Sequence, residues 1–179
     1  IASTGNALDG QGGTISLNVG SGTQGPGGNI LLSAGYTEDS ATGGNINILT
    51  GASEATSSGS IIMETPNSGT EGTSGAVTIS TGTASLGTSG AIYVETGAST
   101  GGSGGSIVMR VGDALPSSGS DSVNGGTVDI IAGSTNAREA TGGNIQISAG
   151  SGLHESESDG GNGGNVNILG GSAKGQHED

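Results

Sequence analysis

Residues 12–20 read Gly12-Gly13-Thr14-Ile15-Ser16-Leu17-Asn18-Val19-Gly20, a pattern of the general form G-G-x-[IV]-x-[LIMV]-x-x-G. Ten copies of this phrase follow one another along the 179 residues, and we number the positions of each phrase from place 1 to place 9. A short, nearly fixed period is typical of a solenoid, in which no repeat can bury its apolar face alone. Place 4 of the successive phrases is Ile15, Ile30, Ile46, Ile61, Val77, Ile92, Ile107, Val128, Ile145 and Val166.

Within a phrase, places 4, 6 and 8 alternate with places 5 and 7, which is the periodicity of a β-strand. Places 4 and 6 are apolar in every copy, and place 8 is small or β-branched in every copy. We therefore predict that this series points inward and that places 5 and 7 point outward. The side chains expected in the core include Ile46, Ile48, Ile92, Val94, Ile145 and Ile147, and those expected to face solvent include Asn47, Tyr93 and Gln146.

The predicted fold class is all-β: a parallel β-solenoid of about ten to eleven short, two-layered coils around a thin core, with identical places stacked about 4.8 Å apart. Paired glycines before each strand are expected to supply the positive φ angles that tight turns need. The array is expected to be a single domain, residues 1–179. Both ends resemble partial repeats, so we expect a segment of a longer repeat region.

Three gaps between phrases are longer than the rest and predict inserted loops at 112–124, 134–141 and 151–162. Their composition, with Pro116 in the first and a run of acidic residues in the third, is typical of loops. All three fall in the same phase of the repeat. We expect them to project from one side, where insertions in a solenoid often form a binding edge.

The composition excludes an ordinary globular core, because the chain has no Phe, Trp or Cys, only two Tyr, and 41 Gly. The regular phase of the Ile and Val residues argues against disorder. Three basic and sixteen acidic residues give a net charge of −13, so nucleic acid is not an expected partner. No apolar run is long enough to insert into a membrane.

Metal and catalytic sites are weakly indicated. The calcium-binding repeat G-G-x-G-x-D-x-U-x differs from this phrase, because places 4 and 6 here hold apolar residues where that repeat needs Gly and Asp. Acidic loops can still supply oxygen ligands, although a solvated charged loop is the plainer interpretation. The weak candidates for a Ca²⁺ site are Asp121, Glu155, Glu157 and Asp159. We predict no other cofactor and no catalytic residues, and we expect Glu95 to form a surface ion pair with Arg110.

Several outward places hold apolar residues that a solvated rod does not require. They form a candidate lateral contact surface or a candidate sugar-binding surface. Ice binding is a further alternative, but it needs an outward column of threonines, and the regular threonines of this chain fall at place 8, which we expect to face inward. The outward apolar residues of the candidate lateral surface are Leu31, Ile62, Tyr93 and Val108.

Runs such as residues 43–51 and 74–90 resemble the Gly/Ser/Thr-rich β-solenoid repeats of large secreted or cell-surface proteins of diatoms and related algae. Similar phrases occur in bacterial and viral β-solenoid adhesins and fibres. The resemblance implies an extracellular or cell-surface protein without catalysis. We expect a structural repeat segment of a fibre, filament or surface coat, with an adhesin or carbohydrate-binding solenoid and then an ice-binding protein as alternatives. The expected partners are the chain itself or neighbouring solenoid coils, end to end and laterally, and extracellular polysaccharide.

Overall fold

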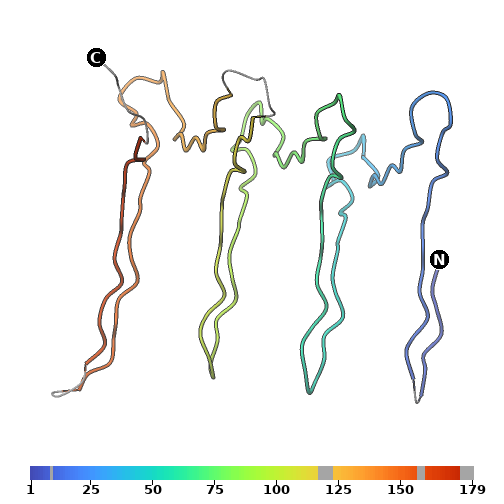
Figure 1. The fold of residues 1–179 in the computed structure, drawn as a ribbon, viewed down its shortest axis with the longest axis horizontal. Coiled ribbons are helices and arrows are strands. Elements are labelled where there is room, and N and C mark those ends of the chain that lie inside the picture. The colour runs from blue at the N-terminus through green and yellow to red at the C-terminus, as the bar shows by residue number, and fades with distance from the viewer. Residues whose placement is uncertain (9, 117–122, 157–159, 174–179) are drawn as a thin grey trace. The chain divides into compact units, whose positions relative to one another are not determined.

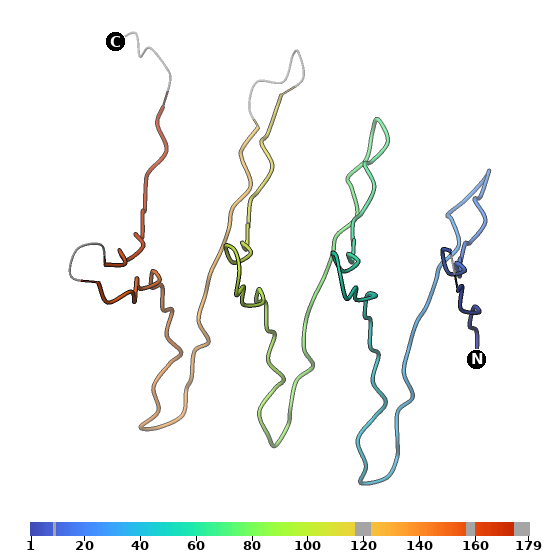
Figure 2. The ribbon, with the colours of Figure 1, turned by 90° about the horizontal axis from the view of Figure 1, so that it is seen from below.

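The computed structural model describes residues 1–8, 10–116, 123–156 and 160–173, and these residues form neither α-helix nor β-strand. The chain divides into two units, Ile1–Gly90 and Ala91–Asp179. Within each unit, extended phrases are joined by linkers into long hairpins (Figure 1). Neighbouring hairpins of a unit point in different directions, as the two perpendicular views show (Figures 1 and 2).

The local conformation follows from the composition of each segment. The alternating Ile, Val and Thr residues of the phrases favour an extended backbone, whereas the bends and turns of the described residues lie in the linkers and in the segment before the first phrase. Hydroxyl groups close these turns: Ser53 Oγ accepts the backbone N–H of Thr56 at 3.0 Å, and Ser99 Oγ accepts that of Gly102 at 3.1 Å. The Ser and Thr content of the linkers therefore has a local cause, because such side chains substitute for backbone partners in turns.

Successive phrases meet where one ends and the next begins. The carbonyl at place 9 accepts a hydrogen bond from the N–H at place 2 of the following phrase, as from Gly44 to Gly35 at 2.9 Å. We name this meeting point the junction. Equivalent bonds occur in both units, so the junction is a property of the phrase; the others run from Gly59 to Gly51, from Gly143 to Gly133 and from Gly164 to Gly150.

The predicted parallel β-solenoid is wrong for this chain. Among the described residues, the backbone–backbone hydrogen bonds are the four at junctions and one from the Gly161 N–H to the His154 carbonyl. None joins places 3–7 of one phrase to another phrase, where a solenoid would carry its ladder. The alternating pattern specifies an extended segment with one apolar face, but it does not specify which segment lies beside it.

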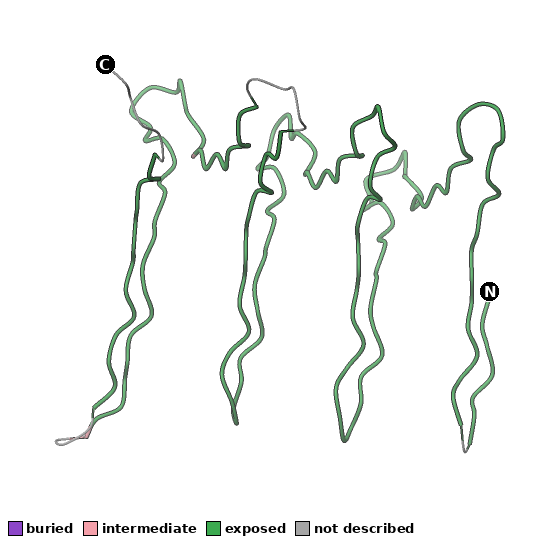
Figure 3. Cartoon of the chain, viewed as in Figure 1, coloured by how far each residue is buried: buried purple, intermediate pink, exposed green. Residues whose placement is uncertain are grey.

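The predicted core is also wrong. Of the described residues only Ala132 and Ser156 are half-buried, and the remainder are exposed (Figure 3). The expected alternation is seen only as a difference in exposed fraction, since Ile92 is 53% exposed and Tyr93 is 85% exposed. The face that carries places 4 and 6 is therefore the more covered one, yet no other part of the described chain closes over it. Ile46, Ile48, Val94, Ile145 and Ile147 are likewise exposed.

The expected positive φ angles at the paired glycines are absent. Among described glycines only Gly25, in a linker, has a φ in the left-handed region, at 99°. The one described residue other than glycine with positive φ is Glu139, at 59°, in the 134–141 loop. The glycines at places 1 and 2 therefore do not serve to reverse the chain, and their role has to be found in their contacts.

Candidate functional site: the junction and the apolar face

Place 2 is glycine in all ten phrases, and the junction explains why. A Cβ atom added to Gly126 would lie 2.6 Å from Val111 Cγ1, and one added to Gly44 would lie 3.3 Å from Ala34 Cβ. In each case the neighbour is the place-8 side chain of the preceding phrase. Glycine suits this position because the place-8 side chain of the preceding phrase lies close to its backbone. The same contact occurs between Val19 and Gly28, Thr50 and Gly59, Thr65 and Gly75, Thr81 and Gly90, Thr96 and Gly105, Ala132 and Gly143, and Ala149 and Gly164.

Place 1 has different surroundings from place 2. It is serine in three phrases, at Ser58, Ser74 and Ser89. A Cβ atom added to Gly104 or Gly125 would meet nothing within 4 Å. Place 1 therefore has room for a side chain, whereas place 2 is closely approached by its neighbour, from within 3.0 Å at Gly28 and Gly126 to 3.6 Å at Gly164. The prediction from sequence treated the two glycines as one feature, although the serines at place 1 alone were a signal that separates them.

Threonine side chains reinforce several junctions. Thr65 Oγ1 donates to the Gly75 carbonyl at 3.1 Å, and Thr81 Oγ1 donates to the Gly90 carbonyl at 3.2 Å. The place-8 hydroxyl thus bonds to the place-2 residue of the next phrase. These hydroxyl protons are used within the chain, which removes donors that an ice-binding row of threonines would present. Two longer bonds of the same kind run from Thr96 to Gly105 and from Thr4 to Gly13.

The junction forms whatever the length of the linker that it closes. Ordinary linkers between place 9 and the next place 1 have six or seven residues, and the longest, 113–124 and 151–162, have twelve. The place-8 to place-2 contact is nevertheless present across each insertion, from Val111 to Gly126 and from Ala149 to Gly164. Place 8 is less exposed than places 4 and 6 in the same phrase, since Val111 is 38% exposed, against 52% for Ile107 and 74% for Met109. The junction is therefore the fixed point of the repeat, and linker length is free to vary.

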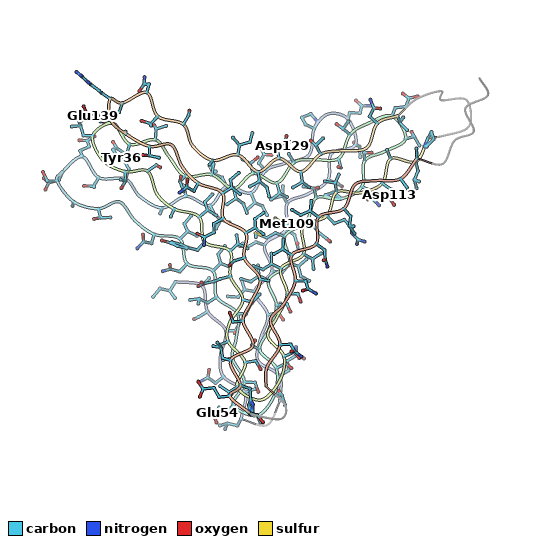
Figure 4. The ribbon with its side chains drawn as sticks, turned by 90° about the vertical axis from the view of Figure 1, so that its left-hand side faces the viewer. Tyr36, Glu54, Met109, Asp113, Asp129 and Glu139 are labelled. Atoms are coloured by element: carbon cyan, nitrogen blue, oxygen red, sulfur yellow. The ribbon has the colours of Figure 1, made fainter. Side chains whose placement is uncertain are left out.

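Most acidic residues lie outside the phrases. In the first unit, Tyr36 and Glu54 lie toward the outer ends of different hairpins (Figure 4). In the second unit, Asp113 and Glu139 lie toward the outer ends, whereas Met109 at place 6 lies nearer the middle (Figure 4). Thirteen of the sixteen acidic residues are outside the phrases, since sixteen less three leaves thirteen; the three inside are Glu64, Glu95 and Asp129.

The ionic contacts differ from expectation. The one ion pair in the described part of the chain joins Arg138 Nε to Glu139 Oε1 at 3.8 Å, and both side chains are exposed. The expected pair between Glu95 and Arg110 is not formed. In a linker of the first unit, Tyr36 Oη donates to Glu38 Oε1 at 2.8 Å.

The candidate calcium ligands are only partly described. Glu155 is exposed in the 151–162 loop, and Asp121, Glu157 and Asp159 lie outside the described residues. Where the chain is described, no group of three or more His, Asp or Glu residues is placed to hold a metal ion. The calcium site therefore stays a prediction.

The candidate lateral surface lies at place 5, and its residues Leu31, Ile62, Tyr93 and Val108 are all strongly exposed. They stand on the face opposite places 4 and 6, so these four phrases present apolar side chains on both faces. The described residues line no pocket and include no helix of the length and hydropathy needed to cross a membrane. Comparisons of the chain with protein-family models, with curated proteins and with solved structures found no match.

Proposed function

We propose that the chain is a structural repeat segment of an extracellular fibre, filament or surface coat and that it carries no catalysis. The observation that supports the proposal is the uniformity of the junction: one place-8 to place-2 contact recurs at every step along both units. A structural array needs one unit repeated without change. A catalytic site would instead need several different functional side chains brought together at one place.

The distribution of charge supports the same function. Acidic residues gather in the linkers, where they keep the surface soluble, and the phrases are almost uncharged. The extracellular location rests on the resemblance of the phrases to Gly/Ser/Thr-rich repeats of secreted and cell-surface proteins.

Immunogold electron microscopy tests this function. Antibodies raised against residues 1–179 should label extended material outside the cell, with gold particles spread along its length. Antibodies against an abundant cytoplasmic protein of the same cells serve as the control. Labelling confined to the cell interior would overturn the extracellular location, and labelling of scattered single particles outside the cell would overturn the structural role.

A further inference from the structure

The solvent-accessible surface of this chain is far too large for a self-sufficient protein. It amounts to 18171 Å² for 16.7 kDa. A compact monomer of this mass exposes about 7,600 Å², and its fully unfolded chain exposes about 24,000 Å². The conformation is thus ordered by repetition and yet leaves open most of the surface that folding normally covers. Surface of this kind needs neighbouring protein to cover it.

The backbone of the phrases also lacks partners. Folded proteins contain roughly one intramolecular hydrogen bond per residue. Here, in the described chain, the N–H and C=O groups at places 3–7 make no backbone–backbone hydrogen bonds. An extended segment with open polar edges is a template on which another extended segment can pair. Both edges of each phrase are available for this pairing.

The charge pattern indicates which surfaces can meet. The phrases carry three acids and Arg110, so two phrases can lie side by side with little repulsion. The linkers carry ten of the remaining thirteen acids and would repel one another if they were brought together. Pairing through the phrases, with the linkers outside, is the arrangement that this distribution favours.

The period of the phrases indicates the partner. Ten phrases with the same places 4 and 6 present the same edge and the same apolar face again and again. A second copy of this chain matches that series at every phrase in one register. An unrelated protein has no matching period, and a polyanion does not suit a chain with a net charge of −13.

We infer that places 3–7 of the phrases pair edge to edge with the same places of further copies of this chain, so that several chains share one apolar core. Ile and Val at places 4 and 6 fill that core, and the junctions hold each chain in the hairpin form that leaves its edges open. The inference rests on the proposed structural function and adds the partner and the surface. It places the pairing between chains rather than within one chain.

Isotope-edited infrared spectroscopy of the purified full chain separates pairing between chains from pairing within a chain. Ile carbonyl carbons are labelled with ¹³C, and labelled chains are mixed with unlabelled chains in unfolding conditions and then returned to native buffer. Aligned labelled carbonyls couple and shift the amide I band. We expect the shift to weaken in proportion to dilution, because neighbouring labels lie on other chains. A shift that is unchanged by dilution would overturn the inference.

Light scattering coupled to size-exclusion chromatography, from low to high micromolar concentration, gives the second readout. We expect a mass that is a whole multiple of 16.7 kDa. Ile145→Ser should raise the dissociation constant at least tenfold, whereas the matched control Gln146→Ser, at the outward place beside it, should leave it within a factor of two. A mass of one chain at all concentrations, or equal effects of the two variants, would overturn the inference. Neither result bears on the immunogold labelling, so the two proposals can fail separately.

Discussion

A methyl group added at Gly126 tests the junction, because the adjacent Gly125 offers an internal control. The Cβ of Ala at position 126 would lie 2.6 Å from Val111 Cγ1. Carbon atoms in contact prefer a separation of about 3.5–4.0 Å, so the overlap is about 1 Å. Overpacking of this size costs about 1–3 kcal/mol. The β-branched Val111 has few alternative rotamers with which to relieve it.

Gly125→Ala should act in the opposite direction. A Cβ atom there meets nothing within 4 Å, and Gly125 has no φ in the left-handed region. Replacing glycine by alanine at a position whose backbone conformation suits alanine stabilises the folded protein by about 0.4–1 kcal/mol, because the unfolded chain loses conformational freedom. The two alanine variants should therefore differ by about 1.5–4 kcal/mol in the free energy of unfolding, although they are adjacent and chemically identical.

Urea unfolding of each variant, followed by far-ultraviolet circular dichroism at one fixed protein concentration, measures this difference. Val111→Ala removes the clashing methyl groups, so in a double-mutant cycle the Gly126→Ala and Val111→Ala changes should show a favourable coupling of about 1 kcal/mol or more. Equal stabilities for Gly125→Ala and Gly126→Ala, or strictly additive effects of Gly126→Ala and Val111→Ala, would refute the steric explanation of place 2.

Four further predictions follow from the same geometry. Thr81→Val removes the hydroxyl that donates to the Gly90 carbonyl at 3.2 Å. The bond is solvent-exposed, so the loss should be at the low end of about 0.5–1.5 kcal/mol in urea unfolding, and a gain would argue that it contributes nothing. Ile92→Asp should abolish assembly in light scattering, because a charge in a shared apolar core has no partner, while Tyr93→Ser at the neighbouring place should assemble normally. Adding Ca²⁺ or a chelator should leave the thermal midpoint unchanged, and a rise with Ca²⁺ that is lost when the acids of the 151–162 loop are changed to amides would establish the site. The purified protein should show neither thermal hysteresis nor shaped ice crystals, because place-8 hydroxyls donate within the chain.

The extended form of the phrases could be predicted from the sequence, because the alternation of Ile92, Tyr93 and Val94 is a local property. The neighbour of each phrase could not be predicted in this way. A strand pattern indicates that one face and two edges need to be covered. The next repeat of the same chain and another chain can cover them equally well. Ile92 is therefore predicted to be buried, although the single chain leaves it exposed.

The glycines show a second limit. Their invariance at place 2 is visible in the sequence, but either of two physical causes can produce an invariant glycine. One is a left-handed φ, and the other is a close approach of a side chain. A left-handed φ is the cause that the sequence predicts, whereas the contact between Gly126 and Val111 shows a close approach. The three serines at place 1 contained enough information to show that the two glycines differ. For the calcium candidates the sequence contained too little information. Whether Asp121, Glu157 and Asp159 could bind one ion depends on loop geometry, which composition alone does not specify.

Because each junction involves only one phrase and the beginning of the next, it is indifferent to how many phrases precede or follow it. Duplication or loss of one phrase with its linker would leave every remaining junction with the same kind of contact. Such an array can lengthen or shorten by whole steps over evolutionary time without passing through a misfolded intermediate. The same independence makes the linkers natural points for inserting foreign peptides, since the length between Val111 and Gly126 already exceeds that between Thr96 and Gly105 by six residues, fifteen against nine, with the same contact at both.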